Sequence, residues 1–556
     1  MGIQSAKQRP LLLDQLSSST FDLLVIGGGA TGAGIALDAA SRGMSVALLE
    51  KMDFAFGTSS RSTKLIHGGL RYLKQFEIKI VHEVGRERAI LHRLAPHLVV
   101  SEPMLLPFVK GGTFGKFSTS LGLWVYDLLA GVSGKDRRVM LSKKKTLDRE
   151  PLLREDILLG SGRYAEYRTD DARLTLENVK AAISYGATAA NYVEVTGFTY
   201  DADHQINGVE AIDHLDGGSL TVKAHQVINA AGPWVDDLRK ENQSMNNKHL
   251  FLSKGVHIVI SHEHFPLHQS VYFDVADGRM IFAIPRGKVT YIGTTDTEYK
   301  GDKNNPRTYL EDVTYLLDAV NHQFPTVKLR LDQVESSWAG LRPLIFEQGK
   351  SASEISRKDE TFRSDSGLIS IAGGKLTGYR KMAEKVVNMA TKTLASRLGK
   401  SWKACQTTQI PLADGVLSSE KDVSAFHKKI ADQLESVGLD SYLAWYLVHM
   451  YGAQADDILI RFRKADEMTE AGLILAELAF GMEEEMVHTA SDFLIRRTGR
   501  LYFDIHSVRQ HAGSVIAAMA RYFDWDEDRI ARETQEILRE VEEVSTFPSE
   551  SEIVLT

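Results

Sequence analysis

The stretch that most constrains the fold of this chain is residues 21–50, FDLLVIGGGATGAGIALDAASRGMSVALLE. A short apolar run of strand type leads into Gly27, Gly29 and Gly32, which follow the order G-x-G-x-x-G. A helical stretch comes next, and a second apolar strand closes the segment. This order of strand, glycine turn, helix and strand predicts a βαβ unit that binds a dinucleotide.

Each part of this unit has a physical reason. Gly27 allows a tight turn after the strand, Gly29 lets the backbone approach a pyrophosphate, and Gly32 lets the helix pack against the strand. The helix N-terminus offers N–H groups and partial positive charge to the phosphates. Glu50, at the end of the second strand, is placed to accept a ribose hydroxyl. The alternative is a purely structural glycine-rich turn, but the flanking strands and the acid favour the dinucleotide.

Composition excludes several classes of protein. The chain has 556 residues, 43% of them hydrophobic, and a net charge of -7, which indicates a multidomain globular protein without a nucleic-acid partner. Cys405 is the only cysteine, so an internal disulfide or a cysteine-based zinc site is excluded. No apolar run is long enough for a membrane-spanning helix, no signal peptide is expected, and the absence of a calcium-loop motif predicts no metal site.

The chain divides into an N-terminal arm or leading helix (1–20), a nucleotide-binding part (21–400) and a helical C-terminal domain (401–556). In the second part we expect helices over 70–94 and 168–185 and strands over 190–196, 206–214, 220–224 and 226–229. Alternating residues from 252 to 295 predict an antiparallel sheet, lying mainly within 251–345. The acidic sequence after Trp525 is expected to end in a disordered tail.

Residues 106–150 interrupt the pattern. An apolar, helix-like run over 121–130 precedes a basic patch over 135–149. One interpretation is a surface helix followed by a solvated charged loop. The other is a monotopic membrane contact, with Trp124 and Tyr126 at the interface and lysines facing anionic lipid.

Glycine-bearing turns recur along the chain, at Gly27–Gly29, Gly68-Gly69, Gly232-Pro233 and Gly373-Gly374. Several such turns in separated parts of the chain favour one long flat ligand lying across several backbone edges. FAD fits this better than NAD, because its isoalloxazine ring must also be seated. The alternative is that the later three turns are only structural.

The segments GGGATGAGIALDAASRG, TSSRSTKLIHGGLRYL, AAGPWVD, KGVHIVI, IGTTDTEY, AGLRPL and GGKLTGYR closely resemble the FAD-dependent glycerol-3-phosphate dehydrogenases of the D-amino-acid-oxidase-like flavoprotein superfamily. The resemblance covers about residues 20–400 and continues into LAFGMEEEMVHTASDFLIRRTGRLYF. It implies an α/β + α fold, in which a Rossmann-like FAD-binding domain is interleaved with an antiparallel-sheet substrate domain and followed by helices.

The resemblance also implies an activity. It is the oxidation of sn-glycerol 3-phosphate to dihydroxyacetone phosphate, with hydride leaving C2 for flavin N5 and electrons passing to a membrane quinone. We therefore expect a cytoplasmic protein at the inner face of the plasma membrane. The sequence leaves open whether the acceptor is quinone or oxygen, whether the chain contacts a membrane peripherally, and whether it forms a homodimer. Two alternatives remain: a related oxidase of an amine, amino acid or hydroxy acid, and a non-catalytic flavin-binding module.

Site residues follow from the matched motifs. Arg71, Tyr72 and Arg357 match positions at the phosphate end of the substrate, and a phosphorylated polyol needs such a cationic pocket. Arg342 matches an arginine beside the reacting carbon, where it could stabilise alkoxide character. Lys375 can bind substrate and place positive charge near flavin N1/O2.

His257 is the candidate base at the C2 hydroxyl, because imidazole has a suitable pKa. A buried core histidine is the alternative, and His67 is a rival to which we assign a flavin-side structural role. Thr294 and Asp296 are expected to shape the site. Beyond Gly27, Gly29, Gly32 and Glu50, the expected FAD contacts are Thr58, Ser59, Ser62, His67, Gly68, Gly69, Val193, Gly232, Trp234, Gly340, Gly374, Lys375, Leu376 and Thr377.

Overall fold

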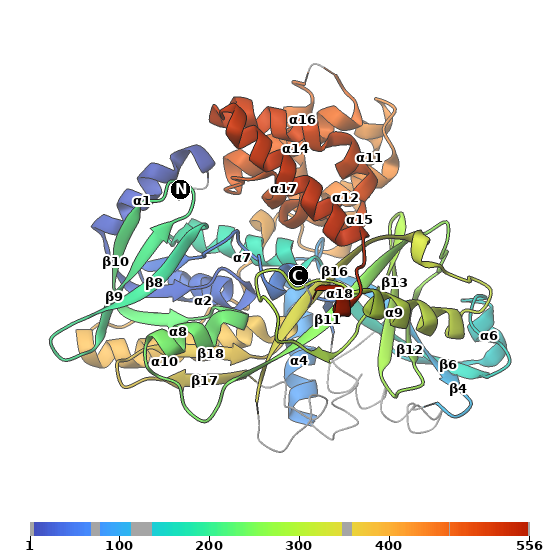
Figure 1. Ribbon diagram of the computed structural model, residues 1–556, viewed down its shortest axis with the longest axis horizontal. Helices are drawn as coiled ribbons and strands as arrows, with labels where there is room; N and C mark the ends of the chain where they lie inside the picture. The colour runs from blue at the N-terminus through green and yellow to red at the C-terminus, as the bar shows by residue number, and fades with distance from the viewer. Residues whose placement is uncertain (1–4, 68–77, 113–135, 347–358, 466, 554–556) are drawn as a thin grey trace.

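A computed structural model describes residues 5–67, 78–112, 136–346, 359–465 and 467–553. Figure 1 shows a mainly parallel sheet on the left, an antiparallel sheet on the right and a block of C-terminal helices above them. This architecture confirms the predicted combination of a Rossmann-like unit, an antiparallel sheet and C-terminal helices.

The first sheet has eight strands, and its central strand β1 (Thr20–Ile26) pairs in parallel with β2 (Val46–Leu49) and β10 (Ser219–Asn229). The main strand order is β17-β18-β10-β1-β2-β7. All of β1 except Thr20 is buried, as expected for a strand covered on both faces. Helix α2 (Ala30–Ser41) follows β1 and packs with its small side chains against α7 (Asp171–Ser184) and α10 (Tyr379–Leu398). The predicted βαβ unit is therefore confirmed.

The two strands predicted over 220–224 and 226–229 are one strand, β10. Its first half pairs antiparallel with β9 and its second half pairs in parallel with β1 and β18. Gln226, which was predicted to begin a separate strand, continues the same strand and pairs with Leu23 of β1. The remaining elements of this part are α1 (Arg9–Ser18), β7 (Thr188–Ala190), β8 (Val193–Tyr200), β9 (Ile206–Asp213), α8 (Val235–Glu241), β17 (Asp359–Arg363) and β18 (Ile369–Gly373).

The second sheet has ten strands, in the main order β15-β11-β14-β13-β12-β4-β6-β3. Six of these strands, β11 to β16, lie at residues 250–345, in line with the prediction that the sheet lies mainly within 251–345. The earlier strands β3 to β6 were not expected in it; they join because β12 pairs in parallel with β4. Strand β4 in turn pairs along most of its length with β6. The strands are β3 (Leu65–Ile66), β4 (Val100–Val109), β5 (Val139–Ser142), β6 (Leu158–Arg168), β11 (Leu250–Ser261), β12 (Ser270–Asp274), β13 (Met280–Arg286), β14 (Val289–Gly293), β15 (Thr297–Glu298) and β16 (Val334–Ile345).

Helices α4 (Ile78–Leu94), α6 (Lys143–Leu147) and α9 (Leu310–Gln323) lie between strands of this sheet in the sequence. The predicted helix over 70–94 is thus observed from residue 78 on. Its first residues, and the apolar run over 121–130, lie outside the described residues. No helix in the described parts of the chain has the length and apolar character needed to cross a membrane.

The C-terminal helices are α11 to α18. The disordered tail predicted after Trp525 is wrong: residues 527–545 form α17, which packs against α16 and β16. Ile537 is buried in this contact, and the Glu533 carboxylate accepts a hydrogen bond from the Ala490 N–H at 2.9 Å. The helices are α11 (Glu420–Glu435), α12 (Ser441–Tyr451), α13 (Ala455–Phe462), α14 (Glu470–Glu484), the π-helix η9 (Asp492–Arg497), α15 (Arg500–Phe503), α16 (Ile505–Phe523), α17 (Glu527–Ser545) and α18 (Glu550–Ile553).

Two buried histidines make the stability of this fold depend on pH. Burial lowers the pKa of His97 to about 3 and that of His488 to about 3, and nearby arginines act in the same direction. In the unfolded chain a histidine takes up its proton near pH 6.5. Between these values the unfolded state binds more protons, so stability is complete above pH 6.5 and falls as the pH is lowered.

We expect the His97→Gln variant to lose part of this acid sensitivity. Each such histidine contributes a slope of about 1.4 kcal/mol per pH unit between its two pKa values. The measurement is the free energy of unfolding of wild type and variant from pH 7 to pH 4.5. The control is the same substitution at the exposed His264. Parallel pH profiles for His97→Gln and wild type would contradict the prediction.

Candidate active site

A cavity of about 610 Å³ lies between the two sheets. Because β1, β10 and β18 are parallel neighbours, their carboxyl ends meet at one edge of the sheet. The turns after these strands contain Gly27 and Gly29, Gly232, and Gly373 with Gly374, and all of them line the cavity. The opposite wall comes from β11 and β16 of the second sheet. The sheet order thus unites three glycine turns that are far apart in the sequence, at the place where open α/β sheets bind ligands.

The first turn is tightly built. Gly27 has φ +109°, and a Cβ there would lie 2.6 Å from the Ala230 carbonyl oxygen. A Cβ on Gly32 would lie 1.8 Å from the Gly27 carbonyl oxygen, so this glycine allows the helix to approach the strand, as predicted. The Ser59 hydroxyl accepts a hydrogen bond from the Ala30 N–H at 2.9 Å, at the start of α2.

Glu50, directly after β2, lies beside this turn. Its carboxylate accepts hydrogen bonds from the Gly28 N–H at 2.6 Å and from the Met52 N–H at 3.0 Å. Burial raises the pKa of this carboxyl, although the two backbone donors oppose that effect. A carboxylate has about four acceptor positions, so Glu50 can still accept a hydroxyl from the cavity that it lines.

His257 lies on β11 and is 1% exposed, yet it lines the cavity. Its Nε2 lies 3.0 Å from the Thr63 hydroxyl, and its ring stacks on Trp338 at 4.7 Å. Its buried Nδ1 has no hydrogen-bond partner among the described residues. Burial holds the pKa of His257 well below its ordinary value, and the positive charges of Arg342 and Lys64 lower it further. The imidazole is therefore neutral and can accept a proton or a hydrogen bond.

Arg342 lies on β16, one end of the same cavity wall. It donates to the Thr294 hydroxyl at 2.9 Å and lies 3.4 Å from the Asp296 carboxylate, which also accepts a hydrogen bond from the Ser253 hydroxyl. Thr294 and Asp296 therefore shape the site by holding this guanidinium. Lys375 lines the cavity at the N-cap of the short helix η6 (Leu376–Gly378).

Two glycines make room for these side chains. A Cβ on Gly293 of β14 would lie 2.1 Å from the His257 ring, and a Cβ on Gly255 of β11 would lie 2.3 Å from the Arg342 guanidinium. Gly293 pairs with His257 across the sheet, and Gly255 is two residues before His257 on the same strand face. The second sheet thus reserves space for one imidazole and one guanidinium above the glycine turns.

Comparison with known proteins shows to which family this chain belongs. Residues 22–380 match the family described as FAD dependent oxidoreductase, and residues 405–530 match the C-terminal domain of alpha-glycerophosphate oxidase. The chain is 49% identical over 543 residues to the aerobic glycerol-3-phosphate dehydrogenase of Staphylococcus aureus, covering 97% of each chain. The chain belongs to the FAD-dependent glycerol-3-phosphate dehydrogenase family. Membership confirms FAD as the cofactor.

Solved structures agree with this family. The glycerol-3-phosphate dehydrogenase of Bacillus halodurans complexed with FAD is 44% identical, with a TM-score of 0.83 and coverage of 98% of each chain. The L-alpha-glycerophosphate oxidase of Mycoplasma pneumoniae has a TM-score of 0.55 at 19% identity, which shows a similar fold alone. The cavity fits the family's cofactor, because it combines backbone turns without Cβ atoms, the start of α2 and the Glu50 carboxylate.

Most of the site residues predicted for this member of the glycerol-3-phosphate dehydrogenase family line this cavity. Gly32 and Val193 do not line the cavity: Gly32 packs α2 on β1, and the Val193 N–H donates to the Glu50 carbonyl oxygen at 2.8 Å. Gly68, Gly69, Arg71, Tyr72 and Arg357 lie outside the described residues. The predicted residues that line the cavity are Gly27, Gly29, Glu50, Thr58, Ser59, Ser62, His67, Gly232, Trp234, His257, Gly340, Arg342, Gly374, Lys375, Leu376 and Thr377.

Some neighbours of these residues were missed. Thr63 and Trp338 hold the His257 ring, and Gly255 and Gly293 leave space in the sheet. The glycines had a signal, because an isolated glycine in a strand pattern indicates close approach of another group. Thr63 lies within the quoted motif TSSRSTKLIHGGLRYL, but nothing in the sequence indicated its contact with His257, which is 194 residues away.

We expect Gly27→Ala to prevent normal FAD loading. The positive φ alone costs about 1–3 kcal/mol for a residue with a Cβ, and the clash with the Ala230 carbonyl oxygen displaces the turn that faces the cofactor. The measurement is the ratio of bound flavin to protein after purification. Gly43→Ala is the matched control, because Gly43 has φ +91° but nothing within 4 Å of its Cβ position. Equal flavin content in the two variants would contradict the prediction.

Proposed function

We propose that this protein oxidises sn-glycerol 3-phosphate to dihydroxyacetone phosphate and passes the electrons to a membrane quinone. The observation that carries the proposal is that Arg342, His257 and Lys375 share one cavity with the glycine turns of the cofactor site. The identity of 49% to an aerobic glycerol-3-phosphate dehydrogenase over almost the whole chain supports the same substrate.

The side chains have complementary roles in this proposal. The neutral His257 accepts the proton of the C2 hydroxyl, because its depressed pKa leaves the imidazole unprotonated at neutral pH. Arg342, held by Thr294 and Asp296, stabilises negative charge on the C2 oxygen as the carbonyl forms. FAD, when bound, supplies a two-electron acceptor for the C2 hydride. Lys375 contributes a positive charge to the same cavity.

Phosphate recognition completes the substrate site in this proposal. Arg71 and Arg357 match the family's phosphate-binding positions and would give charge-assisted, two-donor contacts. A membrane contact at the inner face of the plasma membrane would bring the reduced protein to its quinone. The basic residues of 136–149, among them the exposed Lys144 and Lys145 of α6, support contact with anionic lipid.

The test is anaerobic reduction of the bound flavin. We expect sn-glycerol 3-phosphate to bleach the visible flavin absorption, and glycerol at the same concentration to leave it unchanged, because glycerol lacks the phosphate. Added quinone should restore the absorption faster than dissolved oxygen does. Bleaching by amino acids but not by glycerol 3-phosphate would refute the proposal. Faster reoxidation by oxygen, with peroxide formed, would refute the quinone.

A further inference from the structure

A buried carboxylate, Asp53, joins the cofactor site to the C-terminal helices. We propose that Asp53 is a positioning residue for FAD and that Arg496 and Arg497 of the C-terminal helices hold it in place, so that these helices set the affinity for the cofactor. The inference rests on the proposed cofactor site, because it acts through Glu50 and the glycine turn. In the ranges that the structure describes, the C-terminal helices themselves contribute no residue to the lining of the cavity.

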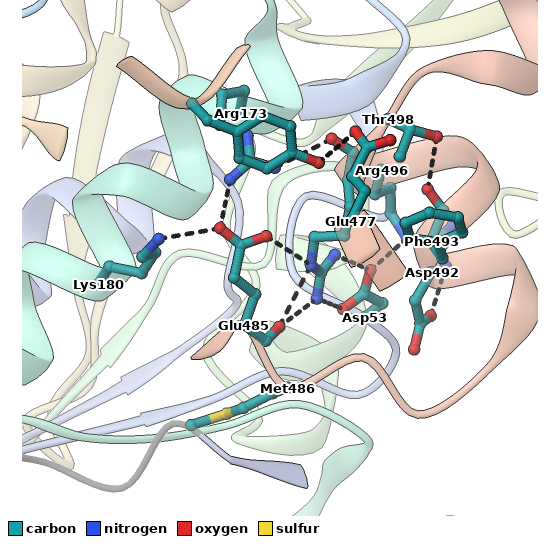
Figure 2. Close-up of polar contacts among 12 residues, drawn as sticks. Asp53, Arg173, Lys180, Glu477, Glu485, Met486, Asp492, Phe493, Arg496 and Thr498 are labelled. Atoms are coloured by element: carbon teal, nitrogen blue, oxygen red, sulfur yellow. Dashed lines mark hydrogen bonds and ion pairs between the residues drawn. The ribbon is translucent and has the colours of Figure 1, made fainter. Parts of the chain in front are cut away.

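Asp53 is surrounded by donors (Figure 2). Its Oδ2 accepts from Arg496 Nε at 2.5 Å and from Arg497 Nη1 at 2.7 Å. Its Oδ1 accepts from Arg497 Nη2 at 2.8 Å and from the Asn191 amide at 3.0 Å. Burial alone would raise the pKa of this carboxyl, but the two guanidiniums outweigh it and hold the pKa well below its ordinary value. Asp53 is therefore a buried, fully ligated anion with its main partners 443 and 444 residues away in the sequence.

The loop that carries Asp53 is also bonded to the cofactor turn. Three residues before it, Glu50 accepts from the Gly28 N–H at 2.6 Å, and two residues after it, Ala55 donates its N–H to the Gly28 carbonyl oxygen at 3.1 Å. Phe56, Gly57, Thr58 and Ser59 then line the cavity. A shift of Asp53 would thus be transmitted to both sides of Gly28 and to the cavity wall.

The arginines are themselves fixed from the side of the C-terminal helices. Both belong to the π-helix η9, a rare element that is frequent at functional sites. Arg496 also binds Asp492 at 2.7 Å, and Arg497 donates to the Glu485 carbonyl oxygen at 2.8 Å. The Arg496 guanidinium lies 5.7 Å from the centre of the Phe56 ring, next to the cavity. Three of the four hydrogen bonds to the Asp53 carboxylate thus come from the C-terminal helices, and the fourth comes from Asn191.

Stability alone does not explain this arrangement. Buried ion pairs lose about as much in desolvation as they gain in attraction, and apolar residues of the same volume often stabilise a protein as well. What an ionic contact adds is one defined geometry, because two planar guanidiniums and one carboxylate fit together in few ways. Here that geometry is imposed on the loop between the ribose acceptor Glu50 and the cavity residue Phe56.

The same interface offers a matched control. Lys180 of α7 pairs with Glu485 at 2.9 Å, and its side chain is largely buried. This pair also joins the first part of the chain to the C-terminal helices, as Figure 2 shows, but Lys180 does not touch the loop over 50–57. Arg173 still binds the Glu485 carboxylate at 2.5 Å when Lys180 is replaced, so Glu485 and its bond to Arg497 stay in place. Breaking the Lys180 pair should therefore lower stability without moving the cofactor turn.

The first experiment measures the Kd for FAD by flavin fluorescence. FAD is titrated into protein from which the cofactor has been removed. We expect Asp53→Asn to weaken FAD binding on the order of tenfold, the size of a typical coupling between linked sites, and Lys180→Met to leave it unchanged. Glu50→Gln should also weaken binding, and the Asp53→Asn/Glu50→Gln double variant should lose less than the product of the two single losses.

The outcomes distinguish an error in the proposed cofactor site from an error in the role of Asp53. If Glu50→Gln binds FAD normally, the proposed cofactor site is wrong and this inference falls with it. If Glu50→Gln weakens binding while Asp53→Asn does not, the cofactor site stands and the role of Asp53 is refuted. Equal losses in Asp53→Asn and Lys180→Met would mean that the interface acts only through general stability, which also refutes it.

The second experiment needs no variant and covers the case in which Asp53→Asn does not fold. Amide hydrogen exchange of the wild-type protein is compared with and without FAD. We expect FAD to slow exchange in the loop over 50–57 and also in residues 485–497, while α11 (Glu420–Glu435), elsewhere among the same helices, stays unchanged. Protection of the loop without any change at residues 485–497 would overturn the inference.

Discussion

His257→Asn is expected to lower kcat by about 10²- to 10⁴-fold, the usual contribution of a general base. The substitution keeps a polar side chain in the space left by Gly293 but removes the nitrogen that can take up a proton. The measurement is steady-state oxidation of glycerol 3-phosphate by the FAD-loaded variant. Thr63→Val is the matched control, because it removes only the contact to Nε2 and should have a smaller effect. A kcat near that of wild type would exclude His257 as the base.

The pH profile gives an independent check on the same residue. Because burial and nearby positive charge lower its pKa, His257 stays neutral when the pH falls through the ordinary histidine value of 6.5. Loss of activity from protonation of this base should therefore begin below pH 6.5 in wild-type protein. An acid limb centred at or above pH 6.5 would show that another group is titrating.

Arg342→Met is expected to lower kcat by about 10²- to 10³-fold, the typical cost of removing one group that stabilises a developing oxyanion. Methionine keeps much of the apolar stem, so the loss reports mainly the guanidinium. We expect kcat to fall far more than KM rises, because the charge on the substrate oxygen grows only as the carbonyl forms. A rise in KM with unchanged kcat would instead place Arg342 in substrate binding alone. Arg363→Met, on an exposed residue of β17, is the control.

The parts of the fold that the sequence predicted are those with local causes. The βαβ unit is encoded by contiguous residues, since the glycine order and the apolar strands are adjacent along the chain. The glycine turns after β10 and β18 were visible for the same reason, and the parallel pairing of these strands with β1 explains why their turns meet. Family motifs then indicated which side chains face the cavity.

The parts that were missed depend on distant contacts. Strands β4 and β6 join the antiparallel sheet because β12 pairs with β4. No local sequence pattern predicts that pairing. The acidic sequence of α17 led to the prediction of a disordered tail. The helix is nevertheless ordered, because its few apolar residues pack against α16 and β16. Asp53 was not singled out in the sequence, because its partners Arg496 and Arg497 are 443 and 444 residues away.

The long pairing of β11 with β16 also limits how this site can vary. His257 is opposite Trp338, Gly255 opposite Gly340 and Ser253 opposite Arg342, so all three pairs share one face of the ladder. Inserting or deleting a single residue between 338 and 342 would turn Arg342 to the other face. Natural length variation among relatives should therefore fall in the connections outside these two strands, while the segments 253–257 and 338–342 keep a fixed length.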